Sequence, residues 1–215
     1  MLKISRPFIL AALATPLLLA TPAPSAPAAG VRDLTGDEYQ RMLELVMDGR
    51  ADQADRLLAA VADTCAGQPL YLLARARLNL EAIPVDDDDK TVTRAVAEPT
   101  YDLLEQVIAH CDAGLEADGD RLDLRFYRGW AWMVHSQLKA FARSFYSAGR
   151  DAGRGKDDLE AYLAVHPADP IANGLLGSYL YFTDAVPRLF QLLSRLLMLP
   201  TGDRERGLAM IDRAV

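Results

Sequence analysis

The chain is poor in cysteine and in aromatic residues. Among its 215 residues only Cys65 and Cys111 are cysteines, aromatic residues make up 7%, and charged residues make up 25%. These values exclude collagen, low-complexity disorder and a disulfide-dense mini-domain. They leave an ordinary globular composition, long enough for one sizeable core or for a short array of repeats.

Positive charge is also scarce, except in one segment. Beyond the first 30 residues the chain carries 30 acidic and 21 basic side chains. Such an acidic body argues against nonspecific nucleic-acid binding, which needs positive charge against phosphate. Residues 31–120 hold 20 acidic and 8 basic side chains, whereas residues 121–156 hold 2 acidic and 8 basic ones. The excess of positive charge therefore lies in residues 121–156.

Acidic residues are missing from the first 30 positions altogether. Two basic residues precede an apolar run at 8–20, and small residues and proline fill 21–30. This order is typical of a secretory signal peptide, and we expect cleavage near Ala28 or Ala29. The run of 13 apolar residues is too short for the roughly 30 Å of a bilayer core. An uncleaved membrane anchor is the alternative.

The sequence therefore predicts two parts. Residues 1–29 are expected to be the signal peptide, and residues 30–215 the mature domain. We expect the mature domain to be exported to the periplasm or the extracellular space, with no transmembrane span after cleavage.

No stretch of the chain alternates apolar and polar residues for long enough to predict a strand. After a capping-box pair, Thr35 and Glu38, apolar residues instead recur at helical spacing. Similar stripes predict an all-α fold with helices starting near residues 35, 50, 69, 99, 122, 157, 170, 187 and 203. We expect the stretch 122–148 to be one long helix that bends near Gly129, or to divide near Ser136.

Residues 82–98 interrupt the helical pattern. They contain Pro84 and the run Asp86–Asp89, which predicts an exposed acidic loop before a helix that restarts at Pro99. The acidic run lacks the alternating ligand spacing and the turn glycine of a calcium-binding loop. We therefore favour a solvated loop over a calcium site.

Antiparallel helix pairs with short links are typical of helical-hairpin repeats. The segments that carry a family resemblance are Gly49–Leu58, Lys156–Leu163, His166-Pro167, Leu176–Tyr179, Val186-Pro187, Leu192-Leu193 and Leu199–Leu208. On these segments the chain resembles a group of exported bacterial tetratricopeptide-like proteins whose functions are mostly unassigned. The resemblance implies a binding scaffold, with no catalytic residue to carry over. Gly129 and Gly177 lie 48 positions apart rather than about 34, so we expect irregular repeats.

The two cysteines fit two alternatives. Cys65 and Cys111 each lie on the apolar face of what would be the second helix of a pair. If successive second helices run side by side, the two sulfurs could form a disulfide in an oxidising compartment. Two separate buried thiols are the other alternative, because cysteine is often a core residue.

The positively charged segment gives a candidate partner-binding surface. On a continuous helix, one face would carry Arg125, Arg128, Trp132, His135, Lys139 and Arg143, which follow one another at steps of three and four. This basic stripe, with Trp132 near its centre, could receive an acidic peptide or an anionic small molecule. The alternative is a solvated helix face that pairs with acidic residues of the same chain.

Two more segments are candidates for contact with a partner. Leu189–Leu199 is apolar on most sides, which suits a core helix, self-association, a partner subunit or a membrane surface. The helix expected at Asp203–Val215 looks like one half of a pair with an exposed apolar stripe. Either a partner covers it, or the chain is a fragment of a longer one.

Patterns for catalysis and metal binding are missing. The three histidines form no metal-binding motif, and His110 and Cys111 point in different directions on a helix. No glycine-rich phosphate loop follows a strand, and no serine has the context of a nucleophile elbow. We therefore expect no enzyme, no cofactor and no metal site.

The sequence predicts a non-catalytic binding or scaffold protein of the bacterial cell envelope, which recognises a protein or peptide through a helical-repeat surface. The alternative is a small-molecule-binding accessory component of an envelope transporter. An enclosed aromatic cavity around Trp130, Trp132, Tyr179 and Tyr181 would favour that alternative, and an open groove would favour the peptide.

Overall fold

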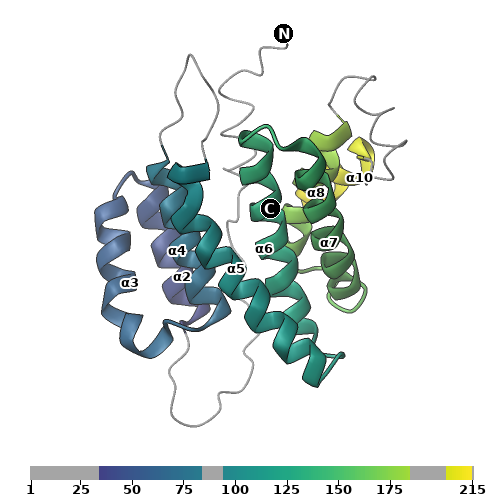
Figure 1. Cartoon of the computed structure of the whole chain (residues 1–215). Coiled ribbons are helices and arrows are strands. Elements are labelled where there is room, and N and C mark those ends of the chain that lie inside the picture. Colours follow the sequence, from purple (N-terminus) through teal and green to yellow (C-terminus); the bar gives the residue numbers. More distant parts are fainter. Residues whose placement is uncertain (1–33, 84–93, 185–201, 215) are drawn as a thin grey trace.

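The computed structural model describes residues 34–83, 94–184 and 202–214, and within these ranges it is all-α (Figure 1). The described helices are α2 (Gly36–Met47), α3 (Ala51–Cys65), α4 (Pro69–Ala82), α5 (Arg94–Ala117), α6 (Leu122–Phe141), α7 (Phe145–Leu163), α8 (Pro170–Asp184) and α10 (Arg204–Ala214). The predicted all-α class is confirmed for the part of the chain that the structure describes. The predicted signal peptide and the helix at Leu189–Leu199 lie outside the described residues.

Side-chain caps explain where three of the helices begin. The Thr35 hydroxyl accepts a hydrogen bond from the Glu38 backbone N–H, and the Glu38 carboxylate accepts one from the Thr35 N–H, which completes the predicted capping box of α2. Asp169 before α8 and Asp203 before α10 each accept a hydrogen bond from the backbone N–H three residues later. Each cap satisfies a backbone donor that the first turn of a helix leaves without an intrahelical partner.

Helix α5 begins earlier than predicted. The expected acidic loop reached residue 98, but α5 starts at Arg94 and contains Pro99 within the helix. Proline lacks the N–H that would bond the carbonyl four residues back and is therefore common in the first turn of a helix, so the sequence predicts a helix start at Pro99. The helix extends through it because Ala97, Thr100 and Tyr101 are buried on either side. The run Asp86–Asp89 lies outside the described residues.

The stretch 122–148 divides into two helices, as one of the two predicted alternatives had it, but the division lies between Phe141 and Phe145 rather than near Ser136. Helix α6 passes through Gly129 and Ser136 and ends at Phe141, and Arg143 then takes a left-handed backbone conformation with φ of 58°. Helix α7 starts at Phe145, twelve residues before the helix start predicted near residue 157, and continues to Leu163. The boundary was missed because a left-handed residue after a helix is usually glycine or asparagine, not arginine.

The described helices pack as four hairpins, α2–α3, α4–α5, α6–α7 and α8–α10, which follow one another roughly from left to right in Figure 1. The second helix of each hairpin contacts the first helix of the next: α3 contacts α4, α5 contacts α6, and α7 contacts α8. Successive first helices also contact each other, as α2 with α4, α4 with α6, and α6 with α8. The same set of neighbours therefore repeats along the chain.

Helix α4 lies within the core. Apolar side chains on every face of this helix are buried, namely Leu70, Tyr71, Leu72, Leu73, Ala74, Ala76 and Leu78. Tyr39 of α2 and Trp130 of α6 meet edge to face, with ring centroids 5.6 Å apart. Side chains of the first, second and third hairpins thus share one core, and the side of the array formed by α2, α4 and α6 is filled at this point.

Glycines bring the helices of two hairpins into close contact. A Cβ atom on Gly155 of α7 would lie 2.9 Å from the carbonyl oxygen of Gly129 on α6. A Cβ atom on Gly177 of α8 would likewise lie 2.9 Å from the carbonyl oxygen of Gly207 on α10. Real Cβ atoms do not approach a backbone oxygen so closely, so glycine is required at both crossings.

Helix α10 differs from the helix with an exposed apolar stripe that the sequence predicts at Asp203–Val215. Its apolar side is not exposed, because Gly207, Met210 and Ala214 are buried and the helix packs against α8. Leu208, which is 44% exposed, is its one large hydrophobic residue on the surface. The helix is the second member of the fourth hairpin.

The two cysteines are buried thiols in the structure. Cys65 ends α3 and Cys111 lies on α5, and α3 packs against α2 and α4 rather than extensively against α5. Burial raises the pKa of the Cys111 thiol to about 12, so this thiol is protonated and unreactive at neutral pH. The disulfide stays a prediction, and a thiol count in unfolded, unreduced protein distinguishes the two alternatives.

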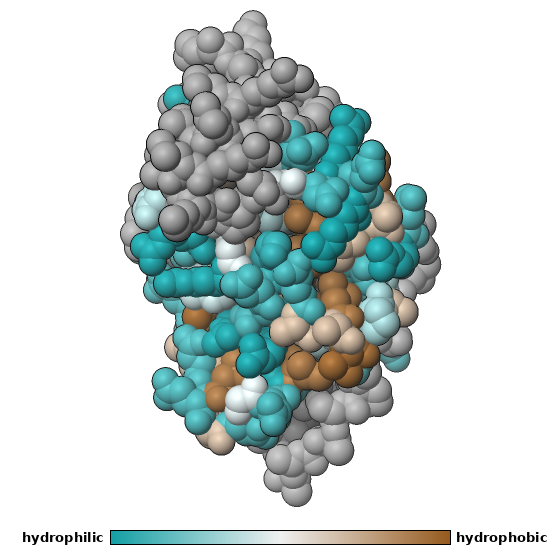
Figure 2. All heavy atoms as spheres, turned by 90° about the vertical axis from the view of Figure 1, so that its right-hand side faces the viewer, coloured by the Kyte–Doolittle hydropathy of each residue, from teal (hydrophilic) through white to brown (hydrophobic). Residues whose placement is uncertain are grey.

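The surface is mixed in polarity. Figure 2 shows the face that points to the right in Figure 1, where hydrophilic residues cover most of the coloured area and apolar residues form smaller patches between them. Among the described helices, none combines the length and the apolar composition needed to cross a bilayer.

Candidate functional site

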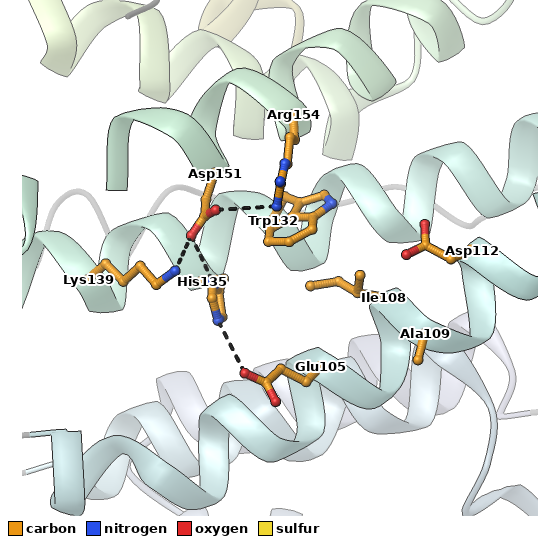
Figure 3. A pocket seen from close by; sticks show the side chains of 9 residues that line it. All are labelled: Glu105, Ile108, Ala109, Asp112, Trp132, His135, Lys139, Asp151 and Arg154. Atoms are coloured by element: carbon orange, nitrogen blue, oxygen red, sulfur yellow. Dashed lines mark hydrogen bonds and ion pairs between the residues drawn. The ribbon is translucent and has the colours of Figure 1, made fainter. Parts of the chain in front are cut away.

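A solvent-accessible cleft of about 380 Å³ lies between α5, α6 and α7 (Figure 3). Its lining comprises Glu105, Ile108, Ala109 and Asp112 of α5, Trp132, His135 and Lys139 of α6, and Asp151 and Arg154 of α7. Three residues of the predicted basic stripe are therefore in this cleft. The α6 side chains form its floor, and the second helices of two successive hairpins form its walls.

The structure modifies the predicted stripe at both ends. Arg125, Arg128, Trp132, His135 and Lys139 all lie on α6, as the spacing predicted. Arg143 does not share their face, because α6 ends at Phe141 and the backbone turns at Arg143 itself. Arg125 and Arg128 are not part of the cleft lining.

The Arg128 guanidinium is held by two carboxylates. Its Nε and Nη2 atoms donate to Asp158 at 2.7 and 2.8 Å, and its Nη1 donates to Asp112 at 2.7 Å. Asp158 is buried, and Arg125 lies 3.7 Å from the same carboxylate. This paired geometry is the one that guanidinium and carboxylate groups prefer. The arginine therefore joins α6 to both α5 and α7.

Asp151 is a second buried carboxylate, and it lies in the lining of the cleft. Lys139 Nζ donates to its Oδ2 atom at 2.6 Å, and His135 Nδ1 lies 3.0 Å from the same oxygen. Burial opposes ionisation of Asp151, but the hydrogen bonds from His135 and Lys139 outweigh it and hold the pKa of the carboxyl below its ordinary value. Asp151 therefore stays ionised at neutral pH and neutralises Lys139.

Trp132 already has a cation against its ring. The Arg154 guanidinium lies 4.7 Å from the indole centroid, and its Nη1 is 3.8 Å from Asp151. The His135 ring meets Trp132 edge to face at 5.6 Å and Tyr101 edge to face at 5.0 Å. These contacts fix the indole at the floor of the cleft with one face towards Arg154.

The α5 wall carries exposed carboxylates. The side chain of Glu105 is 62% exposed and that of Asp112 is 50% exposed. Glu105 Oε1 lies 4.0 Å from His135 Nε2, across the opening of the cleft. The cleft thus has acidic groups on one wall and a guanidinium on the other.

The arrangement is suited to binding. His135 and Asp151 resemble an imidazole and its orienting carboxylate, but the lining contains no serine, threonine or cysteine that they could activate. Within the described ranges, no group of three or more histidine, cysteine, aspartate or glutamate side chains is placed to hold a metal ion. An indole, an isoleucine and groups of both charges are typical of a recognition site.

Four charged lining residues were not singled out as site residues from the sequence: Glu105, Asp112, Asp151 and Arg154. The spacing of Asp151, Arg154 and Asp158 would have placed all three on one helical face. That signal was lost because residues 145–163 were not recognised as one helix. For Glu105 and Asp112 the sequence offered no signal beyond the acidity of the region.

The four aromatic residues named for the small-molecule alternative do not gather in the cleft. Trp130 is buried in the core against Tyr39 and Phe126, and Trp132 alone of the four lines the cleft. Tyr179 and Tyr181 lie on α8, whose contacts are with α6, α7 and α10.

No protein-family model, curated protein or solved structure matches the chain.

Proposed function

We propose that the chain is a non-catalytic binding protein, an irregular tetratricopeptide-like array that recognises a protein or peptide partner. The observation that carries the proposal is the repeated set of helix neighbours. Each hairpin contacts the next through its second and first helices, and successive first helices contact each other. Arrays with this connectivity expose long surfaces formed by equivalent helices, which suit extended partners.

The glycine crossings support the same proposal. In tetratricopeptide-like hairpins a small residue occupies the point where two helices cross, and here both Gly129–Gly155 and Gly177–Gly207 fulfil that requirement. Gly129 and Gly177 are 48 residues apart, which is longer than the standard repeat of about 34 residues and agrees with hairpins of irregular length.

We propose the α5–α6–α7 cleft as the binding site. It combines Trp132, Ile108 and exposed charged groups on rigid helices, which suits a peptide segment anchored by one side chain. The face formed by α2, α4 and α6 is a weaker candidate because Tyr39, Trp130 and the side chains of α4 fill it.

A small-molecule ligand is the second candidate function, in which the chain is an accessory component of an envelope transporter. The volume of the cleft, about 380 Å³, favours it, because small-molecule sites typically measure roughly 300–1,000 Å³. The open form of the cleft and the lack of a surrounding aromatic cavity favour the peptide.

We place this function in the cell envelope, in the periplasm or outside the cell. The support for export is the leader-like composition of the first 30 residues, with two basic residues, an apolar run and a small-residue stretch.

Site-specific photo-crosslinking tests the peptide function. A benzophenone amino acid placed at Ala109, an exposed residue in the cleft wall, should crosslink a partner in envelope extract. The matched control is Ala113, which is exposed one turn further along α5 and is not part of the lining. Adding Trp132→Ala should abolish the crosslink at position 109.

Equal crosslinking at both positions, or no crosslink at either, would contradict the peptide function. The small-molecule candidate is tested in parallel by denaturing protein purified from its native compartment and identifying released compounds by mass spectrometry. A compound that copurifies with the native chain but not with Trp132→Ala would favour the second function.

A further inference from the structure

We propose that the cleft binds a cationic side chain, the arginine or lysine of a basic peptide, rather than the acidic peptide or anionic small molecule considered for the basic stripe. This inference rests on the proposed function, because it names the chemistry of the peptide that the cleft would take. The acceptor groups are the face of Trp132 and the carboxylates of Glu105 and Asp112.

The first step is that the cations of α6 are already neutralised. Arg128 is held by Asp158 and Asp112, and Lys139 is held by Asp151. The partner carboxylates Asp151 and Asp158 are both buried on α7, so these ion pairs hold α6 and α7 together within the chain. An acidic ligand would have to separate buried pairs, and removing one partner of such a pair is strongly unfavourable.

The second step is that carboxylates remain accessible on the opposite wall. Glu105 and Asp112 have side chains that are at least half exposed, and an ionised carboxylate has about four acceptor positions. Asp112 gives one of its oxygens to Arg128 and keeps further acceptor capacity. A guanidinium or ammonium group entering the cleft would find charge-assisted hydrogen bonds on this wall.

The third step is that the structure already holds a cation at this site. Arg154 lies over the Trp132 ring at 4.7 Å and close to Asp151, while its own side chain is 51% exposed. The contact shows that the indole and the neighbouring carboxylate fit a guanidinium. Arg154 is not buried there, so the arginine of a peptide can displace it into solvent and take its place.

The charge of the α5 wall favours the same ligand. Helix α5 carries four exposed carboxylates, Asp102, Glu105, Asp112 and Glu116. An acidic surface beside a cleft attracts a basic peptide over a distance of about one Debye length, roughly 10 Å at moderate salt.

Three labelled peptides of equal length test the proposal, with glycine alternating with arginine, glutamate or glutamine. Fluorescence anisotropy with the purified protein should show binding of the arginine peptide, weakened by high salt. Glu105→Gln should weaken this binding about three- to tenfold, and Trp132→Leu should reduce it further. Arg154→Gln should tighten it about threefold or more, because the ring face is vacated.

Two variants with the same change of charge serve as controls. Glu44→Gln alters an exposed glutamate of α2, and Arg150→Gln alters an exposed arginine of α7 outside the lining. Neither should change the affinity by more than about twofold, because screened surface charges contribute little.

The outcomes separate the ligand chemistry from the proposed function. Preference for the glutamate peptide, with weaker binding by Arg154→Gln, would overturn the cationic ligand but support peptide binding in the cleft. Equal weakening by Glu44→Gln and Glu105→Gln would overturn it as well, because attraction to the acidic chain as a whole would then explain the binding. Absence of binding by all three peptides, together with no crosslink at Ala109, would overturn the proposed function itself.

Discussion

Helices α4 and α6 are the first helices of successive hairpins, and both contribute to the core, but their contacts with neighbouring helices differ in kind. Helix α4 is surrounded by apolar side chains, including Leu73 and Ala74, which are almost completely buried. Helix α6 also contributes to the core, but it is joined to α7 by a glycine crossing and by ion pairs to Asp151 and Asp158.

This difference shows that apolar contacts and polar or close backbone contacts have different effects on the position of a helix. Apolar contacts stabilise a helix in proportion to the area they bury, and they allow some rotation or sliding of the helix. In contrast, the ion pairs of an arginine and the close crossing of two glycines can form only at one relative position of the two helices. We therefore infer that α4 supplies stability to the array, whereas the α6–α7 contacts fix the position of the side chains that line the cleft.

The largest effect is expected from Leu73→Ala in the apolar core around α4. Deleting this buried side chain should lower the free energy of unfolding by about 3 kcal/mol, because it removes apolar burial and leaves a cavity. Urea unfolding measures the change, which should be the same at low and high salt. Leu208→Ala, at an exposed position of α10, is the control and should change stability by less than about 0.5 kcal/mol.

Asp158→Ala is expected to cost somewhat less, about 2–3 kcal/mol, because Arg128 is partly exposed and keeps Asp112 as a partner. The change removes the buried partner of Arg128 and Arg125. Adding Arg128→Met should recover part of the loss, since the unpaired guanidinium is then removed as well. If the changes in unfolding free energy of the two single variants add up to that of the double variant, the ion pair between Arg128 and Asp158 does not stabilise the protein.

Gly155→Ala tests the helix crossing and should lower stability by about 1–2 kcal/mol. The added Cβ atom would lie 2.9 Å from the Gly129 carbonyl oxygen, and that strain should exceed the gain in helix propensity of about 1 kcal/mol. Gly67→Ala is the control, because a Cβ atom there has no neighbour within 4 Å. A neutral Gly155→Ala variant would show that α6 and α7 can separate without cost, which contradicts the comparison.

The smallest effect concerns pH. The pKa of Asp151 lies below its ordinary value of 3.8, so its ionised form stabilises the fold fully above that value and loses this effect as the pH falls through the lower folded-state pKa. The difference in unfolding free energy between the natural chain and Asp151→Asn should therefore shrink between about pH 5 and pH 2. A difference that stays constant over this range would show that the charge of Asp151 does not stabilise the hairpin. Leu73→Ala should show no such dependence.

The helical fold was largely predictable because its signals are local. Apolar spacing, the Thr35–Glu38 capping box and the Asp169-Pro170 start each depend on residues within a few positions of one another. The misplaced boundaries, at Arg94 and at Arg143, occur where the local rule for proline or for a left-handed residue did not hold.

The candidate site was predictable only in part. The sequence placed Arg128, Trp132, His135 and Lys139 on one face, because residues three and four apart on a helix are neighbours. It did not show that Asp151 and Asp158 neutralise that face, since these aspartates belong to the next helix and their positions depend on how the two helices pack.

By itself, the sequence determined the helices, the overall acidity and the one cluster of positive charge, because these properties follow from composition and from spacing along the chain. Only the tertiary structure decided the role of that cluster. Packing α7 against α6 buries two aspartates that must be paired with cations, whereas Glu105 of α5 remains exposed. The segment with the most positive charge thus forms a cleft whose accessible carboxylates come from a neighbouring helix.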